Sequence, residues 1–254
     1  MSSVIIDIMQ LDGLVVIVGI FLLAGAVKGV VGLGLPTVSL VLLTVVFDLK
    51  SAMAMIIIPS LITNIWQGFV GGALLILIQR FWLMFVLTFI SIGFAVKLLH
   101  VVNIDVLSTF LGLVILTYAL YGLTIPTIPD LRSKERWVSP IAGVVNGIIV
   151  GMTGSAVMPG VAYFQSLHLT RDQMIQAMGM LFSISALGLG AAMANEDLLT
   201  VKLTTTSLAG LVPAFIGMWG GLLLRRRVSQ IIFRRILFYS LLIIGAFISV
   251  RAFL

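Results

Sequence analysis

Long apolar segments separated by short polar ones run through the chain from end to end. A transmembrane helix needs about 20 predominantly apolar residues to cross the hydrocarbon core of a bilayer. Six segments come close to that length and end near charged residues. They predict six ordinary transmembrane helices, at 52–78, 81–99, 104–123, 173–194, 200–223 and 231–250.

Two further apolar regions differ from these six. Gly13–Phe47 and Trp137–Thr170 each hold about 35 residues. This length exceeds one upright helix and is too short for two full helices with a loop. In each region a cluster of glycines ends at a proline, Pro36 in the first and Pro159 in the second. Glycine and proline both weaken helices, so we expect a broken helix in each region.

The two regions resemble each other, and three ordinary segments follow each of them. Ala24–Gly29 matches Ala142–Gly147 in its pattern of small residues. The pattern predicts an all-α polytopic membrane protein, with about eight transmembrane helices in two four-helix repeats. The first helix of each repeat is expected to be broken by Gly and Pro. The predicted boundaries are 1–123 for the first repeat, 124–138 for a polar linker loop and 139–254 for the second repeat.

Charged loops predict how the chain lies in the membrane. Lys and Arg are enriched in cytoplasmic loops, which places the basic loop Arg225–Arg235 in the cytoplasm and 195–197 outside. If each glycine-rich region crosses once, the repeats are parallel and both termini lie outside, which is the arrangement we favour. If these regions are re-entrant hairpins, the repeats are inverted; transporters use both types.

Composition fixes the class of protein and excludes several functions. The chain is 61% hydrophobic and only 9% charged, whereas a soluble domain carries about 25% charged residues. The net charge of +6 lies between apolar segments, so we expect a lipid bilayer and no nucleic acid as partner. With no cysteine and only two histidines, neither a metal site nor a cofactor is predicted. We expect a plasma-membrane location, that of a bacterial inner membrane, and leave a homodimer open.

The paired helix breaks are the first candidate for a binding site. Non-helical backbone at membrane depth survives only inside protein or along a wet cavity, and half-helix N-termini attract anions. The first break contributes Gly32, Gly34 and Pro36. The second contributes Thr153, Ser155 and Pro159. Small residues also pack at helix crossings, and the spacing of Gly25 and Gly29 fits that alternative.

Lys28 is the strongest single candidate for a substrate-binding residue, because it is the only charged residue between Asp12 and Asp48. A lysine at membrane depth usually faces a cavity, although one near a helix end can extend to the headgroups instead. Asn146 occupies the matching position in the second region. Asn64 and Gln67, which follow Ser60 and Thr63 after Pro59, and Gln165 complete the predicted substrate-binding set, whose ligand is expected to be a small anion.

The chain resembles the sulfite exporter TauE/SafE family of membrane permeases. The residues that carry the resemblance are Leu23–Pro36, Ser51–Gln67, Ala142–Pro159, Tyr163–Asp172 and Gln176–Gly179. The resemblance covers nearly the whole chain. It implies about eight transmembrane helices in two repeats, and transport of sulfite, an organosulfonate or a related organic acid, in the direction of export.

Two other functions compete with a secondary carrier or facilitator. An integral membrane enzyme would need paired catalytic groups inside the membrane, and the sequence offers no such pair and no ATP-binding loop. A non-transporting partner subunit would carry nothing alone and would co-purify with a permease. We therefore expect no catalytic residue and a transport function.

Overall fold

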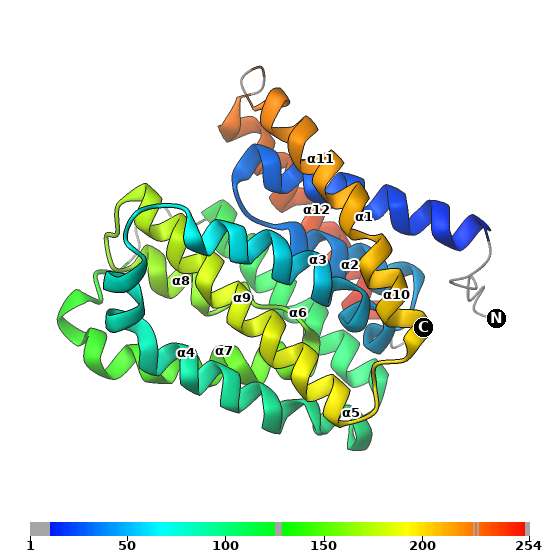
Figure 1. The fold of residues 1–254 in the computed structure, drawn as a ribbon, viewed down its shortest axis with the longest axis horizontal. Helices are drawn as coiled ribbons and strands as arrows, with labels where there is room; N and C mark the ends of the chain where they lie inside the picture. Colours follow the sequence, from blue (N-terminus) through cyan, green and yellow to red (C-terminus); the bar gives the residue numbers. More distant parts are fainter. Residues whose placement is uncertain (1–10, 125–128, 226, 228, 252–254) are drawn as a thin grey trace.

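The computed structural model describes residues 11–124, 129–225, 227 and 229–251, and these are helical nearly throughout. Figure 1 shows the helices packed side by side, with α1, α11 and α12 forming one side of the molecule. The helices are α1 (Leu11–Val31), α2 (Leu35–Val46), α3 (Leu49–Phe69), α4 (Leu74–Val96), α5 (Leu98–Val101), α6 (Ile104–Thr124), α7 (Glu135–Thr153), α8 (Gly160–Gln165), α9 (Arg171–Asn195), α10 (Val201–Ala209), α11 (Leu211–Leu224) and α12 (Gln230–Arg251), with a 3₁₀ turn at Arg132–Lys134.

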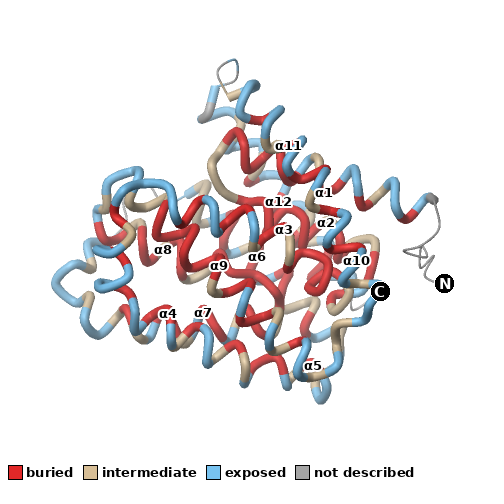
Figure 2. Tube along the Cα trace, in the orientation of Figure 1, coloured by how far each residue is buried: buried red, intermediate tan, exposed pale blue. Residues whose placement is uncertain are grey.

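Seven stretches of the described chain are long and apolar enough to cross a membrane. They are α1, α3, α4 with α5, α6, α9, α10 with α11, and α12. Large apolar side chains such as Trp82 and Phe94 remain exposed. Figure 2 shows the exposed positions along the outer helices, around a buried interior. Because so much exposed apolar surface is stable only against lipid, the chain is a polytopic integral membrane protein.

Helix boundaries differ from the predicted ones around Arg80. The sequence predicted one helix over 52–78 and the next from residue 81, but α3 ends at Phe69 and α4 begins at Leu74. The turn falls at Gly71 and Gly72, whose φ angles of 137° and 77° suit glycine. Arg80 lies within α4 because Glu135 on α7 neutralises it through two hydrogen bonds of 2.6 Å. A charge therefore did not mark a helix end here.

Small residues let two pairs of helices approach closely. A Cβ added to Gly25 would lie 2.2 Å from the carbonyl oxygen of Ala214, and one added to Gly143 would lie 2.5 Å from that of Met84. Gly29 and Gly147 make equivalent close approaches one turn further on. The small-residue spacing of the sequence therefore serves helix packing, of α1 on α11 and of α7 on α4.

These close approaches also give the helix directions. On α1 and α11, Gly25 faces Ala214 and Gly29 faces Met218, so the two helices run parallel. Helices α7 and α4 are parallel as well, because residue numbers increase together along both. The contacts pair Gly143 with Met84, Gly147 with Thr88 and Gly151 with Ala95. The first helix of each half thus packs in parallel on the third span of the other half.

Other pairs run antiparallel. On α3 and α9, Gly68 lies against Gly179 while Gly190 lies against Ile57. On α6 and α12, Gly112 approaches Gly245, and Gly122 approaches Phe238. Corresponding helices of the two halves therefore point in opposite directions, which is the geometry of inverted repeats. The parallel repeats that the sequence favoured do not match these directions.

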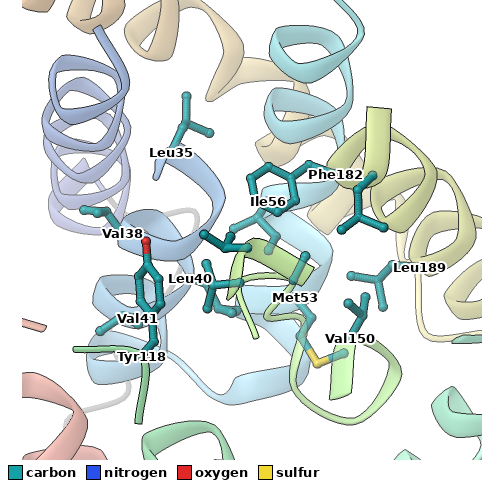
Figure 3. Close-up of a cluster of buried hydrophobic side chains, with 14 of the residues drawn as sticks. Leu35, Val38, Leu40, Val41, Met53, Ile56, Tyr118, Val150, Phe182 and Leu189 are labelled. Atoms are coloured by element: carbon teal, nitrogen blue, oxygen red, sulfur yellow. The ribbon is translucent and has the colours of Figure 1, made fainter. Parts of the chain in front are cut away.

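The helix directions differ from the predicted ones because α2 and α8 reverse the chain. The short α9–α10 connection reverses the chain, so α10 and α11 are antiparallel to α9 and therefore parallel to α3. Helix α1 is parallel to α11. Helices α1 and α3 are then parallel, and α2 must return between them. Helix α2 is buried along most of its length and packs mainly on α1, α3 and α12. Figure 3 shows its Leu40 among the buried side chains that include Met53 and Val150. The backbone of α2 is thus held inside protein rather than in lipid.

The loops separate into two faces. One face carries the 129–134 segment, the start of α9 and the α11–α12 turn; Leu131 N–H donates to Ser166 O at 3.2 Å across it. The opposite face carries the α4–α6 and α9–α10 connections, which His100 and Glu196 join at 3.3 Å. We call the first the linker face. Arg132, Lys134, Arg136, Arg171 and Arg225 lie there.

Candidate functional site

The first helix break lies between α1 and α2. Gly32 and Gly34 have φ angles of 89° and 107°, which an L side chain rarely adopts. Pro36 stands in the first turn of α2, where its missing N–H removes no helical hydrogen bond. No described side chain caps this N-terminus, so its first amides keep their partial positive charge.

Lys28 lies in the last turn of α1 and is only 4% exposed. Its ammonium group donates to Thr63 Oγ1 at 3.2 Å and to the side-chain carbonyl oxygen of Asn64, both on α3. Among the described residues, no carboxylate forms an ion pair with it. The lysine therefore faces the protein interior, and its charge is unmatched by the residues around it.

The two α3 side chains leave a second donor beside the ammonium group. Thr63 Oγ1 also donates to Pro59 O at 2.7 Å, which fixes the hydroxyl. Asn64 accepts from Lys28 through its oxygen, while its buried Nδ2 has no described partner. A cation and a free amide N–H group side by side form an arrangement suited to an oxyanion.

The second helix break follows α7. Gly154 has a φ angle of 76° and ends the helix. Thr153 is occupied with the backbone, donating to Ile149 O at 2.6 Å and accepting from Ser155 N at 3.2 Å. The Ser155 hydroxyl is buried without a described partner. Pro159 stands at the N-cap of α8.

Asn146, the counterpart of Lys28, is fully buried on α7. Neither its side-chain oxygen nor its nitrogen has a partner among the described residues. The side chain lies against the start of α8, because a Cβ added to Gly160 would be 3.0 Å from Asn146 Oδ1. Leaving such a group unpaired costs about 1–3 kcal/mol. An unpaired amide therefore borders the second break.

The two breaks meet at a small cavity between α3 and α9. Pro36 of the first break and Gly154 of the second line its wall. Ser60 and Ser185 line it as well, and both of their buried hydroxyls lack a described partner. Its volume of ≈ 20 Å³ is enough for about one water. An oxyanion is larger, so the surrounding elements must separate before one can enter.

Three predicted residues lie elsewhere. Gln67 donates to Ile175 O at 2.9 Å and so ties α3 to α9. Gln165 accepts from the Tyr121 hydroxyl at 3.1 Å and lines a different, larger cavity. Gly32 gives the chain its turn but meets no other group where a Cβ would stand. Their local sequence did not distinguish these positions from the interior ones.

Sequence reasoning missed Ser185 altogether. It lies in α9, where nothing in its apolar surroundings separates it from Ser183, which donates to its own helix at Gly179 O. The hydroxyl of Ser185 instead stays unpaired beside the cavity. Only the packing of α9 against α3 reveals the difference.

A model of the family described as Sulfite exporter TauE/SafE matches residues 17–248 of the 254. Comparisons with curated proteins and with solved structures find no match. The matched range contains both helix breaks, Lys28 and every helix from the second turn of α1 to the last turns of α12.

Proposed function

The chain belongs to the sulfite exporter TauE/SafE family, and from that membership we propose that it carries sulfite, an organosulfonate or a related small organic acid out of the cell. Transport across a membrane is the activity of the family, and the seven apolar spans suit it. The substrate and the direction are the parts that we propose.

The observation that carries the proposal is the unmatched charge of Lys28. Removing an ammonium group from water costs several kcal/mol unless an opposite charge or several hydrogen bonds compensate it. Thr63 and Asn64 supply two acceptors but no negative charge. A bound oxyanion would supply that charge and would accept from Lys28 and from Asn64 Nδ2 together.

Further donors lie around the same centre. The hydroxyls of Ser60 and Ser185 line the small cavity together with Pro36 in the first turn of α2. The unpaired amide of Asn146 lies against Gly160 at the second break. Anions prefer such sites, since half-helix N-termini and hydroxyls offer hydrogen bonds without a competing carboxylate. We propose that these groups replace the hydration shell of the anion as it passes the membrane centre.

We propose that the linker face lies in the cytoplasm. The basic residues of this face outnumber those of the opposite face, where Lys50, Lys97, Lys202 and Arg251 lie. Positive loops are retained in the cytoplasm. The start of α1 and the end of α12 would then both lie outside, and an exported anion would approach from the linker face.

Flux into proteoliposomes tests the proposal. The variant K28M removes the charge and keeps the length of the side chain, so we expect flux of labelled sulfite or of an alkanesulfonate to fall about 10- to 100-fold, as the loss of one charge-assisted hydrogen bond predicts. K97M is the matched control, because Lys97 is exposed at a membrane face. Equal flux in both variants, with both still folded by thermal unfolding, would remove Lys28 from the transport site.

A further inference from the structure

A cavity of ≈ 1350 Å³ lies at the linker face, apart from the small cavity between the breaks. Its walls come from α6, α8, α9, α11 and α12, with the α1–α2 break at one side. Val31 and Leu33, on either side of Gly32, line it. Val31 lies one helical turn beyond Lys28, so the cavity extends from the linker face to the backbone beside the candidate site.

Three arginines from three helix ends line this cavity. Arg171 begins α9, Arg225 follows the end of α11, and Arg234 lies near the start of α12. No Asp or Glu is among the described residues that line it. The ion pairs found in the described chain use Arg80, Arg132, His100 and His168, and none involves these three arginines.

Arg132 of the linker behaves differently. Arg132 pairs with Asp130 at 2.7 Å, and its hydrogen bonds lower the pKa of that carboxyl to about 2. Its charge is thus balanced locally, on the exposed surface. The cavity arginines keep a positive charge that the cavity wall does not balance. Arg234 lies over the Phe238 ring with 5.7 Å to the centroid, and this contact holds its guanidinium group against the wall.

We propose that this cavity, the arginine vestibule, is a second anion-binding site that gathers the substrate anion before it reaches Lys28. This inference rests on the proposed transport function. A concave, low-dielectric wall lined by one sign of charge focuses the field and raises the local concentration of the opposite ion. Trp219, 67% exposed, and Tyr121 line the same cavity and offer flat apolar surface, which suits the organic part of a small organic anion.

Quenching of Trp219 fluorescence measures the access of small molecules to the vestibule. The variants W66F, W82F and W137F together leave Trp219 as the single tryptophan, and the protein is placed in zwitterionic nanodiscs. Quenching by the anion iodide measures anion accumulation, and quenching by neutral acrylamide measures access alone. We expect R171Q/R225Q/R234Q to lower the iodide quenching constant by at least about twofold and to leave that of acrylamide unchanged. R132Q/K134Q/R136Q removes the same number of basic side chains from the same face, outside the cavity, and should have little effect. Equal effects of the two triple variants would overturn the proposal.

Flux measurements separate the gathering of substrate in the vestibule from its passage across the membrane. In proteoliposomes loaded for flux from the linker face, the vestibule triple variant should raise KM several-fold at low salt, keep kcat, and lose its difference from the parent at high salt. An unchanged KM would show that the vestibule does not gather substrate, even if iodide collects there. Loss of iodide quenching on adding a few per cent of anionic lipid, with KM unchanged, would assign the arginines to lipid headgroups. Failure of the transport proposal is a separate result, because it is shown by equal flux in K28M and K97M and not by the vestibule variants.

Discussion

The ammonium group of Lys28 donates to the side-chain carbonyl oxygen of Asn64, which lies 36 residues further along the chain. The contact joins the last turn of α1 to α3 beside the first helix break. Asn64 satisfies the lysine as a hydrogen-bond acceptor without cancelling its charge. We propose that an external anion balances it.

Replacing Asn64 by aspartate should block transport while preserving the fold. In N64D the new carboxylate would pair with Lys28 and take the place of the anion. We expect flux to fall by at least about tenfold, as the loss of one charged hydrogen bond predicts, and the melting temperature to stay the same or rise. N195D, at an exposed position on the opposite face, is the control. Normal flux in N64D would show that the lysine does not need an external anion.

Small residues on α1 should matter for stability in proportion to their contacts. G25A places a methyl group within 2.2 Å of the Ala214 carbonyl oxygen and should destabilise the protein by about 1–3 kcal/mol. G19A lies on the same helix with nothing within 4 Å of the added Cβ, so it should leave stability unchanged or raise it. Thermal unfolding in one detergent compares the two. Similar melting temperatures would contradict the close packing of α1 on α11.

Gln176 should prove structural rather than part of the transport site. It is fully buried, donates to Gly68 O at 2.9 Å and accepts from Ala73 N at 3.0 Å. Q176M leaves both backbone groups unpaired and should cost about 1–3 kcal/mol. We expect a lower melting temperature with KM unaltered at a temperature where the variant is folded. A raised KM with unchanged stability would instead place Gln176 in contact with the substrate.

Cysteine labelling can decide the orientation cleanly, because the chain has no cysteine of its own. S133C lies exposed on the linker face, and N195C lies exposed on the opposite one. With the linker face in the cytoplasm, a membrane-impermeant maleimide applied to intact cells should label N195C and spare S133C. The reverse pattern would place the vestibule outside and make export by this route untenable.

The sequence alone determined the membrane class, the two sites of helix breakage and the isolated charge at position 28. Each of these follows from local physics: hydrocarbon excludes polar backbone, glycine tolerates left-handed angles, and a lone lysine in an apolar run needs a reason. Only the tertiary structure decided that α2 turns back inside the protein, that Asn64 rather than Gln67 contacts Lys28, and that Ser185 lines the central cavity. Contacts between distant helices depend on how whole faces pack, and no short stretch of sequence records them. The same holds for the three vestibule arginines, which come together only once α9, α11 and α12 are assembled.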